Sequence, residues 1–149
     1  MFQFFRSLPV TILFFYCVPT IQYAQGPQQH DVYGSWTMVE MVYGGQVQDP
    51  PDAGFKSIKI EKGKWISTHI ESKLPVEWKI VIRSDKTPKE IDLIGIVNEK
   101  KESVPFQGIY EFKDGRLRII LAQAGMARPT EFAPLKNETW TMYTLKKAK

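Results

Sequence analysis

The fold is decided by three stretches: Thr87-Pro88-Lys89-Glu90-Ile91-Asp92-Leu93, Gly108-Ile109-Tyr110-Glu111-Phe112 and Arg128-Pro129-Thr130-Glu131-Phe132. They gather a tyrosine, an arginine and several carboxylates in a short span, which at first sight is typical of an active site. Placed on strands and turns, they are better interpreted as a strand entry, a glycine bend beside a core tyrosine, and a proline turn. The three stretches therefore predict architecture rather than chemistry.

Apolar and polar residues alternate with a period of two over most of the chain. The alternation is clearest at Val76, Trp78, Ile80 and Ile82, and again at Leu117, Ile119 and Leu121. Asp114-Gly115, just before the second run, is typical of a two-residue hairpin turn. With the other glycine and proline turn signals, the pattern predicts about eight short strands and no long helix. We expect one all-β domain.

The period of two leaves open whether these strands form a sandwich or a closed barrel. Closure removes the exposed edges of a sheet, and an eight-stranded barrel has room inside for side chains or for one small ligand. The choice between the two needs more than periodicity.

The N-terminal residues have the layout of a secretory signal. Arg6 precedes an apolar stretch from Leu8 to Val18. This stretch is about half of the roughly 20 residues that a membrane-spanning helix needs. We predict a signal peptide over residues 1–24, a flexible lead over 25–33 and the folded domain over 34–147. An uncleaved N-terminal anchor is the alternative.

Several classes of chemistry lack support in the sequence. Cys17, the only cysteine, lies inside the predicted signal, so the mature chain has no thiol for disulfides, catalysis or zinc binding. The histidines, His30 and His69, are isolated, and the pattern around His69 predicts that it faces outward. No nucleophile elbow, P-loop or dinucleotide fingerprint occurs. We predict no metal, no cofactor and no catalytic residue. The remaining enzymatic alternative uses paired carboxylates such as Glu77, Glu111 and Glu131.

The charge pattern argues against nucleic acid as a partner. The chain has a formal net charge of +4 and a pI of about 9.1. Its basic residues are interleaved with acidic ones, as in Lys59-Ile60-Glu61-Lys62, which is typical of a solvated surface. A nucleic-acid-binding domain more often shows one basic stripe. We predict no nucleic-acid partner, and a monomer.

Further motifs carry a resemblance to a known family. Gly34-Ser35-Trp36 is the G-x-W pattern that opens lipocalin barrels, and Thr144-Leu145-Lys146-Lys147 closes the chain. With the three stretches above, in this order and spacing, the chain resembles a lipocalin-like domain family best known from planctomycete-type bacteria. The resemblance implies a single antiparallel up-and-down lipocalin-like β-barrel of about eight strands in an exported protein. It implies no activity, because none is established for the family. The chain departs from the family pattern in ending on lysine rather than arginine.

Three residues are predicted to form a structural latch. Arg128 and Glu131 flank a proline turn, and we expect them to pair across it. The alternative for Arg128 is stacking on Trp36, because in lipocalins a closing arginine stacks on the G-x-W tryptophan. Tyr110 is expected in the core, and Gly108 is expected where two backbones approach closely.

The candidates for lining an interior ligand site are Trp36, Trp78, Tyr110 and Trp140. Such aromatic residues suit an apolar ligand, although they also fill small barrels. The leading hypothesis is a periplasmic or extracellular, non-catalytic domain that binds a small apolar ligand and has no membrane span once its signal is cleaved. The alternative is a solid-cored domain whose surface binds another exported or envelope protein. Interior volume separates the two, since ligand sites typically have about 300 to 1,000 Å³.

Overall fold

The structure, a computed structural model, describes residues 32–48, 55–71, 74–98, 101–133 and 139–149. The strands of this part are β1 (Gly34–Tyr43), β2 (Gln46–Gln48), β3 (Phe55–Glu61), β4 (Lys64–His69), β5 (Val76–Arg83), β6 (Lys89–Asn98), β7 (Lys101–Glu102), β8 (Phe106–Lys113), β9 (Arg116–Ala122) and β10 (Trp140–Lys147). The described part contains no helix, and so none long and apolar enough to cross a membrane. The predicted signal over 1–24, most of the lead, Cys17 and His30 lie outside the described residues.

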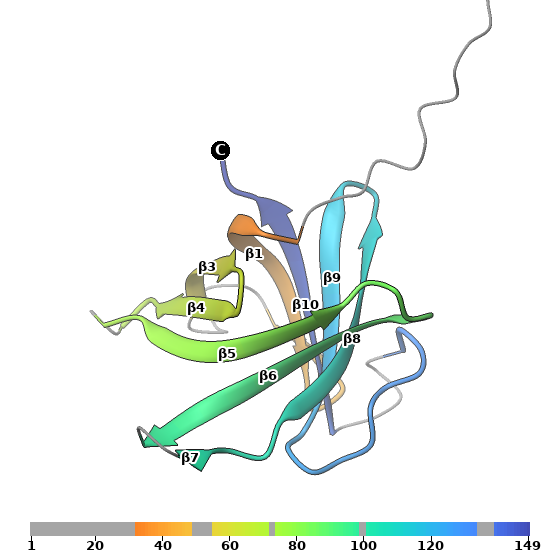
Figure 1. Ribbon diagram of the computed structural model, residues 1–149. Helices are drawn as coiled ribbons and strands as arrows, with labels where there is room; N and C mark the ends of the chain where they lie inside the picture. The colour runs from red at the N-terminus through yellow and green to blue at the C-terminus, as the bar shows by residue number, and fades with distance from the viewer. Residues whose placement is uncertain (1–31, 49–54, 72–73, 99–100, 134–138) are drawn as a thin grey trace, which may run out of the picture.

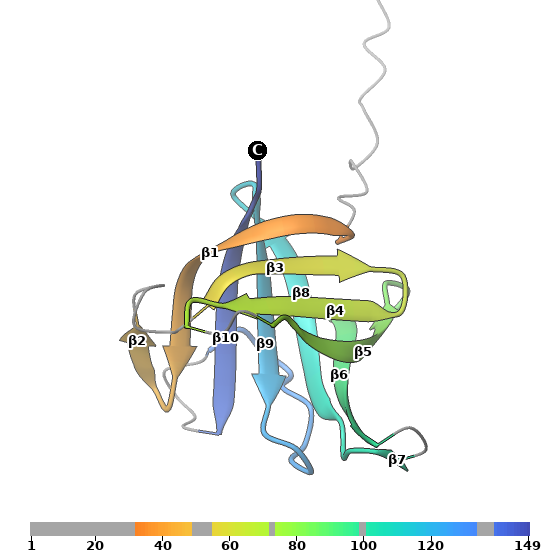
Figure 2. The same ribbon diagram turned by 90° about the vertical axis from the view of Figure 1, so that its left-hand side faces the viewer.

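Eight of the strands close into an antiparallel barrel, as Figure 1 shows. The strand order is β10-β9-β8-β6-β5-β4-β3-β1, and pairing of β1 with β10 closes the ring. Neighbouring strands in the barrel are neighbours in the chain except at the closure, so the topology is up-and-down. The predicted all-β lipocalin-like barrel is confirmed, and the sandwich alternative is excluded. The short strands β2 and β7 extend β1 and β6 beside the barrel (Figure 2).

A bulge in β1 changes which side chains point inward. The register with β10 shifts between Met38 and Glu40, so one residue of β1 is extra at this point. Because side chains alternate along a strand, an extra residue reverses the alternation beyond it. Met38 and Met41 consequently both join the interior cluster, whereas Val42 joins a different cluster on the outer face.

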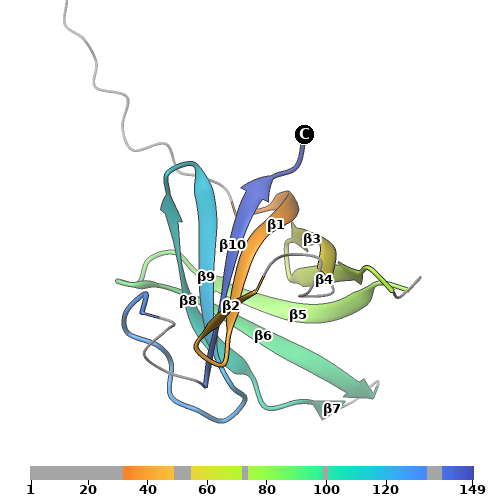
Figure 3. The same cartoon turned by 180° about the vertical axis from the view of Figure 1, so that it is seen from behind.

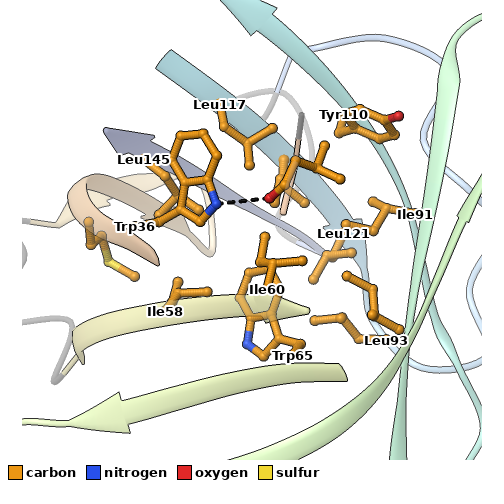
Figure 4. Packing of buried hydrophobic residues seen from close by; sticks show 14 of the residues in the cluster. Trp36, Ile58, Ile60, Trp65, Ile91, Leu93, Tyr110, Leu117, Leu121 and Leu145 are labelled. Atoms are coloured by element: carbon orange, nitrogen blue, oxygen red, sulfur yellow. Dashed lines mark hydrogen bonds between the residues drawn. The ribbon is translucent and has the colours of Figure 1, made fainter. Parts of the chain in front are cut away.

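The interior is filled most tightly by aliphatic side chains, several of which Figure 4 shows around Trp36. Ile58, Ile60, Leu117, Ile119 and Leu145 have no exposed surface. They come from β3, β9 and β10, whose inward positions alternate with outward polar residues such as Lys59 and Arg118. The period-two pattern in the sequence therefore translates directly into one wall of the core.

One end of the barrel, here called the closed end, is sealed around Trp36. The Trp36 indole Nε1 donates a hydrogen bond of 2.9 Å to the carbonyl of Val32, drawn as a dashed line in Figure 4. The ammonium of Lys147 lies 4.4 Å from the centroid of the Trp36 ring and donates a 2.6 Å hydrogen bond to the carbonyl of Tyr33. The start and the end of the barrel chain are thereby fastened together over the core.

Gly34 is required at this closed end for two reasons. Its φ is 127°, a conformation that residues with side chains rarely adopt. A Cβ at Gly34 would also lie 2.7 Å from the Lys147 ammonium. The glycine and the tryptophan of the G-x-W motif therefore both serve the contact with Lys147.

We expect Lys147→Ala to lower the free energy of unfolding by about 1 kcal/mol, because it removes a cation–π contact and a hydrogen bond to a backbone carbonyl. Chemical denaturation monitored by tryptophan fluorescence measures the change. Lys146→Ala is the matched control, since Lys146 is the exposed neighbour on the same strand. Equal effects of the two substitutions would contradict the role given to Lys147.

Candidate functional site

Two adjoining cavities occupy the end of the barrel opposite Trp36, here called the open end. The inner chamber, of about 200 Å³, is lined by Trp65, Ser67, His69, Val76, Trp78, Leu93, Phe106, Leu121 and Tyr143. The outer chamber, of about 600 Å³, is lined by Met41, Tyr43, Gln48, Phe106, Leu121, Ala122, Gln123, Thr141 and Tyr143. Phe106, Leu121 and Tyr143 belong to both linings, so the two chambers share a wall.

Four aromatic side chains shape the inner chamber. Trp78 and Phe106 meet edge to face with their ring centroids 5.7 Å apart. Trp65 and Tyr143 are tilted by 59° at a centroid distance of 6.1 Å. Such pairs hold rings in preferred relative orientations. The chamber walls are therefore made of mutually packed rings rather than of long flexible side chains.

Three polar groups face this aromatic chamber. Ser67 is almost fully buried, and its hydroxyl donates a 3.4 Å hydrogen bond to the carbonyl of Val76 on the neighbouring strand. His69 follows two residues later on the same face of β4. The third is the phenol of Tyr143 on β10. Burial, with a smaller contribution from Tyr43, raises the pKa of Tyr143 to about 12, so this phenol stays neutral at physiological pH.

The prediction that His69 faces outward is wrong. His69 lines the inner chamber together with Trp65 and Ser67, which share its face of β4 because side chains alternate. Ile70, an apolar neighbour of His69 in the alternating pattern, is 52% exposed. The signal that could have placed Ser67 and His69 on the inner face is Trp65. This large aromatic residue is two positions before Ser67 and four before His69, so the three side chains lie on one face of the strand.

The four predicted interior aromatic residues take three different places. Trp78 lines the inner chamber. Trp36 and Tyr110 are buried in the core cluster and line neither of these two chambers. Trp140 packs on a second cluster, so its predicted interior position needs correction. On β10 the residues that face the interior cluster are Tyr143 and Leu145, and Trp140 has the opposite parity.

This second cluster lies on the outer face of the barrel wall. It consists of Val42, Ile109, Ile120 and Met142, with Phe132 and Trp140 packed against it. Phe132 belongs to the β9–β10 connection, whose described part runs outside the barrel wall (Figure 3). The guanidinium of Arg118 lies 5.2 Å from the Phe132 ring centroid and pairs with Glu111 at 2.7 Å. The connection therefore covers an apolar strip that would otherwise be exposed.

Arg128 holds the same connection against β6 and β8. Its Nη2 lies 2.7 Å from Oδ1 of Asp92, and its Nη1 donates a 2.5 Å hydrogen bond to the carbonyl of Gly108. The contact with Oδ1 is an ion pair without the alignment of a hydrogen bond. Pro129, the next residue, is fully buried. The three stretches that decide the fold thus meet at one arginine.

Asp92 is a buried carboxylate held between two arginines. Arg83 donates a 2.7 Å hydrogen bond to Oδ2 of Asp92, and a second bond of 3.2 Å to Glu90. The bond to Asp92 is the main reason that the pKa of Arg83 is raised above its ordinary value. We call Arg83, Glu90, Asp92 and Arg128 the outer ion-pair cluster. A buried charge is tolerated only when it is paired in this way.

The latch predicted from Trp36, Arg128 and Glu131 corresponds to two separate contacts in the structure. The cation over the Trp36 ring is Lys147, at the closed end. Arg128 contacts Asp92 and Gly108 on the outer wall, while Glu131 is exposed on the connection. The predicted close approach at Gly108 is confirmed, since a Cβ there would collide with the Ile120 carbonyl.

The carboxylates considered for acid–base catalysis include two that pair with cations on the outside of the barrel. Glu77 pairs with Lys64 at 2.8 Å, and Glu111 pairs with Arg118 at 2.7 Å. Among the described residues, no group of three or more histidine, cysteine, aspartate or glutamate side chains is placed to hold a metal ion.

We expect Arg128→Ala to lower the free energy of unfolding by about 2 to 4 kcal/mol, because it leaves Asp92 buried with a single partner and frees the connection from Gly108. Denaturant titration measures this loss. The control is Arg116→Ala, an exposed arginine on β9, which we expect to change stability by no more than about 0.5 kcal/mol. A loss at Arg128 as small as that at Arg116 would refute the role of the cluster.

Stability should also depend on Tyr143 at alkaline pH. Because folding raises the pKa of Tyr143 from its usual 10 to about 12, the stabilisation is complete below pH 10 and is lost as pH rises towards 12. At about pH 11 the loss is about 1 kcal/mol. Tyr143→Phe removes this component, so wild type should lose about 1 kcal/mol more stability than the variant between about pH 9 and about pH 11. Parallel stability curves would contradict burial of the phenol.

Comparisons with protein-family models, with curated proteins and with solved structures found no match to this chain. The resemblance to a lipocalin-like family carried by Gly34-Ser35-Trp36 and the three stretches therefore stays a prediction. The lipocalin-like barrel itself is established by the strand order and its closure.

Proposed function

We propose that this protein is a non-catalytic binding domain that holds one small apolar molecule in the chambers at the open end of its barrel. The observation that carries the proposal is the volume of these chambers, about 600 Å³ and about 200 Å³. Ligand sites typically have about 300 to 1,000 Å³ and are lined mainly by apolar and aromatic side chains. Both properties are present here.

The arrangement of the barrel supports the same proposal. Trp36, Val32 and Lys147 seal the closed end, so that the core there needs no ligand to be filled. The chambers begin at Phe106 and Tyr143, which line both of them. A rigid closed end that supports a hollow open end suits a binding domain, because the walls of the site are held before the ligand arrives.

The scaffold alternative calls for an interior filled by side chains throughout. Filling of this kind is found around Ile58 and Ile60, in the half of the barrel near Trp36. Met142 lies in the outer cluster and so fills no part of the interior. We therefore favour ligand binding over the scaffold function. We further propose that binding takes place outside the cytoplasm, on the strength of the signal pattern in residues 1–24.

The test is the fluorescence of N-phenylnaphthylamine, a probe whose emission rises in apolar cavities. We expect saturable enhancement with the purified protein. Thr141→Trp, which places an indole in the outer chamber, should weaken probe binding by at least about fivefold, because an indole that overfills the site costs about 1 to 3 kcal/mol.

Ser35→Trp is the matched control, since Ser35 is exposed at the closed end. This variant adds the same indole far from the chambers and should bind the probe like wild type. Absence of enhancement with wild type, or equal binding by both tryptophan variants, would refute the proposal.

A further inference from the structure

We propose that the ligand is an uncharged aromatic molecule with one hydroxyl or carbonyl group, whose ring enters the inner chamber and whose polar group meets Ser67, His69 or Tyr143. This inference rests on the proposed function and names its ligand class. Three properties of the chamber lining support the inference. They are the positions of its polar groups, its lack of permanently charged side chains in the described part of the chain, and its walls of aromatic rings.

The polar groups are few and lie close to the aromatic walls. Ser67 and His69 are two residues apart on one face of β4, so their Cβ atoms are separated by roughly 7 Å. Tyr143 lies against Trp65, the neighbouring inward residue on that strand. The hydroxyl of Ser67 donates to the Val76 carbonyl and keeps its lone pairs for a donor from a ligand. A ligand ring between these walls thus lies within reach of a hydrogen-bonding partner.

The linings of both chambers contain no lysine, arginine, aspartate or glutamate among the residues that the structure describes. A carboxylate or ammonium placed there would be desolvated with no permanently charged side chain of the described lining to pair with, which is costly. The same burial that keeps the phenol of Tyr143 protonated at neutral pH would act against an anionic ligand group. Neutral hydroxyl and carbonyl groups avoid this cost and still use the polar side chains.

The walls favour a flat ring over a flexible chain. Trp78 and Phe106 stand edge to face, and Trp65 is tilted against Tyr143. Faces and edges of rings are thus both available to a planar guest, which can adopt the offset or edge-to-face contacts that aromatic groups prefer. A volume of about 200 Å³ suits a compact ring system. A long aliphatic chain would extend into the outer chamber and use few of these contacts.

The experiment is displacement of N-phenylnaphthylamine by naphthalene, naphthol and naphthoate, which share one ring system and differ in a single group. We expect naphthol to bind about fivefold more tightly than naphthalene, the effect of one net hydrogen bond. Naphthoate should bind at least about tenfold more weakly than naphthol, because its charge is buried without a partner.

Ser67→Ala should reduce the preference for naphthol over naphthalene, and Tyr143→Phe should do the same. Thr68→Ala is the control, since Thr68 has the opposite parity to Ser67 on the same strand. It should keep the wild-type preference. A loss of the preference in only one of the first two variants would still support the inference and identify the bonding group.

The outcomes separate this inference from the proposed function. Equal affinity for naphthalene and naphthol would overturn the polar contact, while the chambers would remain a binding site. Tightest binding of naphthoate would overturn the uncharged class. Failure of N-phenylnaphthylamine to bind wild type would overturn the binding function, and this inference with it.

Discussion

The ion pair between Arg128 and Asp92 joins parts of the chain that are far apart in sequence. A carboxylate as buried as Asp92 would destabilise the fold if it were alone, and Arg83 on β5 and Arg128 on the β9–β10 connection compensate its charge from two sides. The second nitrogen of Arg128 reaches the carbonyl of Gly108, where the absent side chain lets β8 and β9 approach closely. Three motifs that looked like a catalytic constellation are thus one structural junction.

Because this junction fixes the connection outside the barrel wall, other features depend on it. Phe132 and Trp140 pack on the outer cluster, and the apolar outward residues Ile109 and Ile120 are covered. A barrel wall that is apolar on both faces at this point needs such a cover, since an exposed apolar strip is a site of aggregation. β9 is accordingly buried along most of its length, from Leu117 to Ala122.

The two ends of the barrel have different tasks. At the closed end, Lys147 spans the start and the end of the domain and packs on Trp36. An arginine in its place would stack its planar guanidinium on the ring, whereas the lysine acts as a point charge. At the open end the interior holds polar groups, rings and unfilled volume instead of interlocked aliphatic side chains. Stability is concentrated at one end, and the unfilled volume in which we propose that a ligand binds lies at the other.

The strands and their closure could be predicted from the sequence because alternation and turn signals are local properties. Val76 to Ile82 and Leu117 to Leu121 gave the right period, and Asp114-Gly115 gave the right turn. The alternation predicted the wrong face for Trp140 and His69. β10 carries apolar residues on both of its faces, and Ile70 is apolar although it is exposed. The partners of Arg128 could not be read from the sequence, because they depend on a connection folding back over another part of the sheet.

The central claim is that the open end holds a ligand while the closed end and the outer wall do not. The four tryptophans report on these places separately: Trp65 and Trp78 line the inner chamber, Trp36 lies at the closed end, and Trp140 lies on the outer wall. The most direct measurement follows their indole N–H signals by nuclear magnetic resonance during titration with naphthalene. The account predicts that the Trp65 and Trp78 signals shift with saturation while the Trp36 and Trp140 signals stay in place. A shift at Trp140 alone, or four unchanged signals, would contradict it.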